Sequence, residues 1–271
     1  MKNMMTYFSS LPLLHRLPRL LCSLGVAVCC LLLAPLAVAG PYQVYGPYYA
    51  WVNNFNDPKG IMQPVDTHLK TKDNSVHLDV SFNYQDSSLY GYPAIVRGSH
   101  YGWNPTGDRL FPRPFSAFRT IPVAFNYTIS GSQLAGDFAY DLFLRHDNLA
   151  DKPQLEVMIW GDHNSWPLGR ELVKNAIRQS GISFDLWGGY NAGAGYYTYS
   201  FVPTGTVGRS APLATSGHLN LDLKPFLDWL AQHPLDNGGF DRTMTLDVVE
   251  AGFEVVRGEG QVHMRASINA L

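Results

Sequence analysis

The feature that most constrains the fold is a series of short runs rich in β-branched and aromatic residues, separated by Gly, Pro, Asn and Asp. Strands at this density, with turn residues between them, are typical of an all-β sandwich or jelly roll. The sequence therefore predicts two packed β-sheets. The predicted strands are Val76–Tyr84, Ala94–Arg97, Ala124–Ile129, Gly136–Arg145, Leu155–Trp160, Ile182–Trp187, Tyr196–Phe201, Met244–Glu250 and Gly252–Arg257.

One short helix is predicted over Leu221–Leu230. Its apolar residues recur at helical spacing and are Leu223, Phe226, Leu227 and Leu230. Asp222 would lie in its first turn, on the favourable side of the helix dipole. A second segment, Arg170–Gln179, fits either a helix or an ordered loop.

The first 39 residues have the pattern of a secretory signal peptide. Lys2, Arg16 and Arg19 form a basic start, an apolar run follows over residues 20–36, and Ala37-Val38-Ala39 ends it. We expect cleavage after Ala39 and a secreted protein, extracellular or periplasmic, with residues 40–271 as a single domain. The alternative is an uncleaved membrane anchor, because the apolar run is almost long enough to span a bilayer.

The composition of residues 40–271 limits the partners. All three cysteines (Cys22, Cys29 and Cys30) precede residue 40, so the mature chain must be stabilised by its core without disulfides. Its 17 basic and 22 acidic residues give a net charge of about −5 (17 − 22). This charge favours neither nucleic acid nor an anionic membrane as a partner. We expect a monomer with no membrane contact after signal cleavage.

Three predicted strands place an acid on the face opposite their apolar residues. In Leu155–Trp160, alternation puts Glu156 on one face with Met158 and Trp160. By the same alternation, Asp141 and Glu254 point away from the apolar faces of their own strands. Any one of these acids could be an ordinary solvated residue. Three of them beside a tryptophan indicate a groove.

Such a groove could cleave a glycosidic bond. Cleavage requires one carboxyl group that is protonated and another that is ionised, and an additional acid can share a proton with the ionised one. Glu156, Glu254 and Asp141 could supply this set.

The sequence resembles glycoside hydrolase family 12, the compact endo-β-1,4-glucanases and xyloglucan-cleaving enzymes. The similarity spans nearly the whole mature chain, and the matching segments follow the family's order. They are Val52-Asn53-Asn54-Phe55, Tyr92-Pro93-Ala94-Ile95, Gly98-Ser99-His100-Tyr101-Gly102, Ala139-Tyr140-Asp141-Leu142, Glu156-Val157-Met158-Ile159-Trp160, Pro167-Leu168-Gly169, Tyr199-Ser200-Phe201, the predicted helix, and Ala251-Gly252-Phe253-Glu254.

The resemblance implies a two-sheet β-jelly roll with the substrate across a concave sheet, and retaining hydrolysis of a β-glucan without metal or other cofactor. It implies Glu156 as nucleophile, Glu254 as acid/base and Asp141 as the acid bonded to the nucleophile. Retention implies carboxyl groups of Glu156 and Glu254 about 5–5.5 Å apart. The implied substrate-binding residues are Asn54, His100, Tyr101, Met158, Trp160 and Pro167.

The sequence departs from the family at positions where tryptophan is common, which here are Asn56, Tyr101 and Val256. Trp51, Trp103, Trp166 and Trp187 could replace the missing stacking surface or could be ordinary packing residues. The function expected is a secreted endo-β-1,4-glucanase that cleaves cellulose-type or mixed-linkage β-glucan. The alternatives are a xyloglucan-specific endoglucanase, for which smaller residues would leave room for side branches, and a non-catalytic glycan-binding jelly roll.

Overall fold

The structure is a computed structural model that describes residues 40–70, 74–146, 152–235 and 239–271. The predicted signal peptide and its cleavage site lie outside the described residues. Within the described ranges, no helix is long and apolar enough to cross a membrane.

The described residues form thirteen β-strands, one α-helix and one 3-10 turn. The strands are β1 (Tyr42–Tyr45), β2 (Tyr48–Trp51), β3 (Gln63–Lys70), β4 (Ser75–Tyr84), β5 (Ala94–Gly98), β6 (Arg113–Pro114), β7 (Pro122–Arg145), β8 (Leu155–His163), β9 (Arg170–Gln179), β10 (Ile182–Asn191), β11 (Tyr196–Pro203), β12 (Ser216–Asp222) and β13 (Thr245–Ile268). The helix is α1 (Lys224–Gln232), and the 3-10 turn is Phe115–Ala117.

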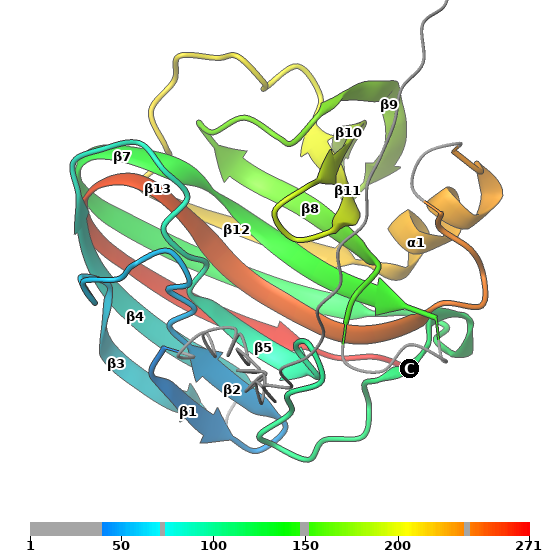
Figure 1. Cartoon of the computed structure of the whole chain (residues 1–271), viewed down its shortest axis with the longest axis horizontal. Coiled ribbons are helices and arrows are strands. Elements are labelled where there is room, and N and C mark those ends of the chain that lie inside the picture. Colours follow the sequence, from blue (N-terminus) through cyan, green and yellow to red (C-terminus); the bar gives the residue numbers. More distant parts are fainter. Residues whose placement is uncertain (1–39, 71–73, 147–151, 236–238) are drawn as a thin grey trace, which may run out of the picture. The chain divides into compact units, whose positions relative to one another are not determined.

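Two 24-residue strands, β7 and β13, pair with each other and contribute to two layers (Figure 1). The first layer, which we call the site sheet, has the strand order β1-β2-β5-β13-β7-β8-β11-β10-β9. The second layer consists of β3 and β4 on one side of the long pair and β12 on the other. The pairing register shifts on both sides of Arg257, where the long strands pass from one layer to the other. Near this bend the position of Gly131 requires a glycine, because a side chain there would collide with the Glu259 carbonyl.

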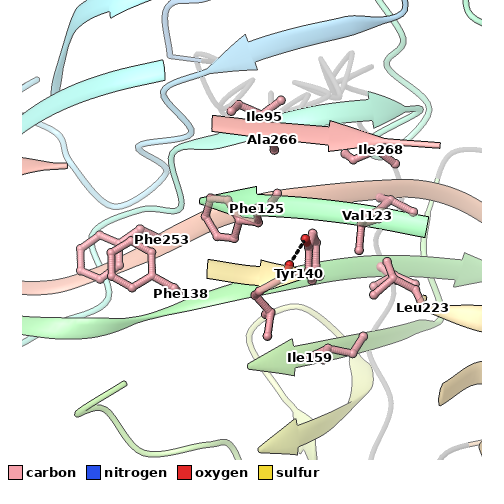
Figure 2. Packing of buried hydrophobic residues seen from close by; sticks show 14 of the residues in the cluster. Ile95, Val123, Phe125, Phe138, Tyr140, Ile159, Leu223, Phe253, Ala266 and Ile268 are labelled. Atoms are coloured by element: carbon pink, nitrogen blue, oxygen red, sulfur yellow. Dashed lines mark hydrogen bonds between the residues drawn. The ribbon is translucent and has the colours of Figure 1, made fainter. Parts of the chain in front are cut away.

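The core lies between the two layers. Phe125 in one half of β7 packs against Phe138 and Tyr140 in the other half, with ring centroids 6.2 and 5.9 Å apart (Figure 2). The Tyr140 hydroxyl donates a hydrogen bond of 2.6 Å to the Leu219 carbonyl. The predicted alternation is confirmed, because the following residues are all buried in this core: Tyr140, Leu142, Leu144, Leu155, Val157, Ile159, Phe253 and Val255. The predicted all-β two-sheet jelly roll with one short helix is also confirmed.

The helix begins later than predicted. Leu221 and Asp222 are the last residues of β12 and pair with Val123 and Pro122 of β7. Pairing with a neighbouring strand therefore determines their conformation, and Asp222 is not in the first helical turn. Its carboxylate nevertheless accepts a hydrogen bond from the Lys224 backbone N–H. The apolar spacing correctly predicted the buried face of α1.

The prediction for Arg170–Gln179 is wrong, because this segment is strand β9, paired with β10. Its half-buried apolar residues are Leu172, Val173, Ala176 and Ile177, which is the spacing of a helix. A register shift opposite Phe184 and Leu186, together with a positive φ of 50° at Asn175, interrupts the two-residue alternation. The bulge allows both apolar pairs to face the core, and the sequence pattern therefore resembles a helix.

Candidate active site

Strands β13, β7 and β8 bring five acidic side chains to one face of the site sheet. Asp137 lies directly opposite Glu254, and Asp141 lies directly opposite Glu250, as cross-strand partners of β7 and β13. Glu156 on β8 lies opposite Phe143, two residues along β7 from Asp141. Cross-strand partners project to the same face, so all five carboxyl groups lie on the side away from the core.

Four of these five carboxyl groups are almost entirely removed from water. Asp137 and Glu250 are fully buried, Asp141 is 5% exposed and Glu156 is 9% exposed. Glu254 is half-buried. Several buried anions close together repel one another, so some of these groups must hold protons at neutral pH.

Asp141 and Glu156 form the first hydrogen-bonded carboxyl pair. Burial raises the pKa of Glu156 to about 7, and hydrogen bonds from Thr198 and Asp141 oppose that rise. The Thr198 Oγ1 donates to Glu156 Oε2 over 2.5 Å. Burial, followed by the charge of Glu156, raises the pKa of Asp141 well above its ordinary value. Asp141 is therefore the proton donor of this pair, and Glu156 is the acceptor that becomes the anion.

Asp137 and Glu254 form the second pair. Burial, followed by the charge of Asp137, raises the pKa of Glu254 well above its ordinary value. Burial raises the pKa of Asp137 only to about 6, because hydrogen bonds from Glu254 and Ser165 stabilise its anion. The Ser165 Oγ donates to Asp137 Oδ2 over 2.7 Å. In this pair the glutamate holds the proton.

The fifth acid, Glu250, is paired with a histidine. His100 Nδ1 lies 2.6 Å from Glu250 Oε1. The His100 ring packs edge-on against Trp51 and Phe143, with centroids 4.8 and 5.3 Å away. His100 therefore contacts both the carboxyl groups, through Glu250, and the aromatic residues at one end of the site.

Apolar side chains flank the carboxyl groups on both sides. One cluster contains Tyr49, Trp51, Tyr92, Ala94, Val96, Phe143, Tyr196 and Val248. The other contains Ala139, Met158, Trp160 and Val202, with Trp187 packed against it. One row of cross-strand partners connects both sides through all nine strands of the site sheet: Val44, Tyr49, Val96, Glu250, Asp141, Met158, Ser200, Trp187 and Glu171. The site sheet thus places packed apolar side chains on both sides of central groups that can move protons.

Four of the predicted substrate-binding residues lie beside the carboxyl groups. Met158 and Trp160 share the face of Glu156, and His100 contacts Glu250. The Tyr101 hydroxyl donates to that of Tyr196 over 3.0 Å, and Tyr101 is 38% exposed.

The other two predicted substrate-binding residues have different surroundings. The side chain of Asn54 is hydrogen-bonded to Asp57, in the loop after β2. Pro167 is buried in the loop between β8 and β9. Within the described part of the chain, no recorded contact joins either residue to the carboxyl groups.

Two positions that lack the family's tryptophan contact one loop instead. Asn56 Nδ2 donates to the Leu89 carbonyl over 2.8 Å, and the Val256 carbonyl accepts from the Ser88 N–H over 3.1 Å. Among the tryptophans considered as replacements, Trp51 is buried and packs against Trp103 at 5.5 Å. Trp166 is 63% exposed and lies edge-on to Trp187 at 6.0 Å. Trp166 is therefore the candidate with the most free surface.

Sequence reasoning missed Asp137 and Glu250. The signal was available, because both long strands place two acids four residues apart, Asp137 and Asp141 on one and Glu250 and Glu254 on the other. With a period of two, both acids of each strand face the same side. It also missed Thr198 and Ser165, whose importance depends on which carboxyl group each one contacts.

The arrangement can perform acid–base and nucleophilic chemistry. It provides a glutamate that ionises near neutral pH and another that remains protonated, and these are the two states that acetal cleavage requires. Within the described ranges, no group of three or more His, Cys, Asp or Glu side chains is arranged to hold a metal ion.

A jelly roll with two carboxyl pairs on one sheet face is the arrangement expected of a glycoside hydrolase. Comparison with known families specifies the class further: the chain belongs to glycosyl hydrolase family 12, whose model matches residues 53–269.

Individual relatives agree with this membership. A xyloglucan-specific endo-beta-1,4-glucanase A from Aspergillus niger is 29% identical over 158 residues, which cover 56% of each chain. The match thus spans little more than half of that relative's length. A family 12 xyloglucanase from Bacillus licheniformis superposes with a TM-score of 0.67 at 22% identity, covering 86% of this chain and 97% of that one. Endoglucanase 3 from Trichoderma harzianum gives 0.61 at 20% identity, covering 85% and 96%. These structures share the fold.

Proposed function

We propose that this protein is a retaining endo-β-1,4-glucanase in which Glu156 is the nucleophile and Glu254 the acid/base. The observation that supports these roles is the opposite protonation of the two glutamates. Glu156 accepts hydrogen bonds from Thr198 and Asp141, whereas Glu254 donates to Asp137. A nucleophile must be ionised, and an acid must hold its proton.

In the first step, Glu156 attacks the anomeric carbon while Glu254 transfers its proton to the departing glycosidic oxygen. A covalent glycosyl-enzyme forms, and the first part of the glucan leaves as an alcohol. The proton of Asp141 stabilises the anion of Glu156 before attack.

In the second step, the ionised Glu254 removes a proton from water as the water attacks the anomeric carbon. The bond to Glu156 breaks, and Glu156 returns to its carboxylate form. Two inversions at the same carbon retain the β configuration. Proton NMR of the first products should therefore show the β-anomer before mutarotation.

For the substrate we propose an unbranched β-1,4-linked glucan, of the cellulose or mixed-linkage type. The half-buried Trp103 and Trp187, one packed against each apolar cluster, offer ring faces to successive glucose rings. Xyloglucan is a second candidate, for which two observations speak. The relative from Aspergillus niger is named xyloglucan-specific. Asn56 and Val256 are also smaller than the tryptophans common in the family, which would leave room for a side branch.

Product analysis on carboxymethyl-cellulose, mixed-linkage glucan, xyloglucan and xylan in parallel tests the proposal. We expect reducing-sugar release from the first two substrates, and Glu156→Gln should abolish it. Release from xyloglucan alone would establish the second candidate. Undiminished release by Glu156→Gln would contradict the role of Glu156.

A non-catalytic glycan-binding jelly roll would bind glucan without releasing reducing sugar. The buried carboxyl pairs argue against this alternative, because a binding module does not need acids with raised pKa values. For the whole chain we propose secretion after cleavage at Ala39 and a single monomeric domain over residues 40–271. Sequencing the amino terminus of the protein recovered outside the cell tests the cleavage site.

A further inference from the structure

Asp137 is a fully buried acid for which the proposed double displacement gives no role. It lies on β7 as the direct cross-strand partner of Glu254. Its neighbour Gly136 allows β7 and β13 to approach closely, because a Cβ there would lie 2.0 Å from the Glu254 carbonyl oxygen. The two carboxyl groups are thus held together by the backbone pairing itself.

The loop after β8 holds this part of β7 in place. Asn164 Oδ1 accepts from the Gly136 N–H over 3.0 Å, and Asn164 Nδ2 donates to the Leu134 carbonyl over 2.9 Å. The adjacent Ser165 donates to Asp137 Oδ2. Between Asp137 and Ala139 the pairing of β7 with β8 shifts register, which is a common way to orient a side chain. Asp137 therefore occupies a constructed position with a dedicated donor.

Other titratable groups surround the pair formed by Asp137 and Glu254. Asp141 lies on the same strand, Glu250 lies on β13 and Glu156 lies on β8, so the neighbouring acids disfavour a further negative charge. The Tyr92 hydroxyl donates to the Ala139 carbonyl over 2.8 Å, and after burial the charges of Asp141, Glu250, Glu254 and Asp137 contribute to its raised pKa. His163, opposite Asp137 on β8, has a pKa lowered by burial. No recorded ion pair within the described residues neutralises Asp137.

We propose that Asp137 is a positioning residue for the acid/base Glu254, holding the Glu254 proton on the site sheet through the hydrogen bond between the two carboxyl groups. This inference rests on the proposed function of Glu254. When Glu254 transfers its proton to the glycosidic oxygen, Asp137 remains an anion and its hydrogen bond to Glu254 is lost. When Glu254 takes a proton from water, the bond forms again. Repulsion from Asp137 makes the ionised Glu254 a stronger base for that second step.

The direct test is a titration of the protein labelled with carbon-13 at its Asp and Glu carboxyl groups, with Glu254→Gln used to assign the Glu254 signal. In Asp137→Asn the neighbouring anion is lost, so we expect the pKa of Glu254 to fall by about one unit or more. The matched control is Asp185→Asn. Asp185 is a buried aspartate of the same sheet that accepts from the Asn175 N–H at 2.7 Å. This control should leave the pKa of Glu254 unchanged.

Ser165→Ala is a second, milder variant in case Asp137→Asn does not fold. Loss of the hydroxyl donor should raise the pKa of Asp137 above about 6 and lower that of Glu254, because the shared proton then moves toward Asp137. An unchanged or raised pKa of Glu254 in a folded Asp137→Asn, an equal fall in the Asp185 control, or an unchanged pKa of Glu254 in Ser165→Ala would overturn the inference.

Kinetics separate this inference from the proposed function. In Asp137→Asn the alkaline limb of kcat/KM on glucan should move to lower pH with the pKa of Glu254. With a 2,4-dinitrophenyl glycoside the limb should stay in place, because that leaving group needs no proton. If the pKa falls but the two substrates respond alike, the role of Glu254 as acid is wrong, although the pairing with Asp137 stands.

Discussion

The two carboxyl pairs of the site sheet have the same composition, one aspartate and one glutamate, but hold their proton on opposite members. In the first pair the hydroxyl donor, Thr198, contacts the glutamate, and Glu156 is the anion. In the second pair the hydroxyl donor, Ser165, contacts the aspartate, and Glu254 holds the proton.

The comparison suggests that the position of one hydroxyl group selects which acid ionises. All four carboxyl groups have raised pKa values because of burial, so burial alone does not distinguish them. A hydrogen bond to a charged group contributes roughly 1.5–3 kcal/mol, which is enough to move a shared proton from one oxygen to another.

The largest expected effect comes from removing the side chain of Asp141, the proton donor of the first pair. Because Asp141 is protonated, Asp141→Asn keeps a neutral donor to Glu156 and should retain most of the activity. Asp141→Ala removes the donor and should lower kcat/KM roughly ten- to hundredfold. Initial rates on mixed-linkage glucan measure both. Equal losses in the two variants would show that Asp141 is not the neutral member of its pair.

The next effect concerns stability and distinguishes the two glutamates. The folded pKa of Glu156, about 7, lies above its ordinary value of 4.5. The wild type therefore loses stability as pH rises from about 4.5 through 7, because the folded state binds this proton more tightly than the unfolded state. Glu156→Gln does not titrate, so its stability relative to wild type should rise by about 2–3 kcal/mol between pH 5 and pH 8.

Glu254→Gln provides the comparison for that experiment. Glu254 keeps its proton to higher pH than Glu156, so the wild type loses stability over more of this interval on its account, and replacing Glu254 by a neutral amide should give a larger gain between pH 5 and pH 8. Urea unfolding at pH 5 and pH 8 measures both variants. A larger gain for Glu156→Gln than for Glu254→Gln would reverse the assignment of protons to the two pairs.

The smallest effect comes from the hydroxyl donor of the first pair. Thr198→Val keeps the shape of the side chain but removes the bond to Glu156, so the pKa of Glu156 should rise by up to about one unit. Since the nucleophile must be ionised, the acid limb of kcat/KM should move to higher pH. A profile of kcat/KM against pH tests this shift, and an unchanged acid limb would mean that Thr198 does not select the anion.

Much of the fold could be predicted from local patterns. The alternation in Leu155–Trp160 correctly separated the core face from the face of Glu156, because a strand buried on one side has a period of two. The same rule failed for β9, where a bulge gives four apolar residues the spacing of a helix. The helical spacing of apolar residues gave the wrong start for α1, because pairing with β7 keeps Leu221 and Asp222 in a strand.

By itself the sequence determined the alternating faces of its strands, the identities of Glu156, Glu254 and Asp141, and the family to which these segments belong. These properties depend on residues close together along the chain. Only the tertiary structure decided that Asp137 and Glu250 join them, and that Ser165 and Thr198 contact different members of the two pairs. The reason is register: Asp137 and Glu254 are far apart in sequence, and only the pairing of β7 with β13 makes them neighbours. Their proton affinities then depend on the burial and hydroxyl donors that this pairing creates.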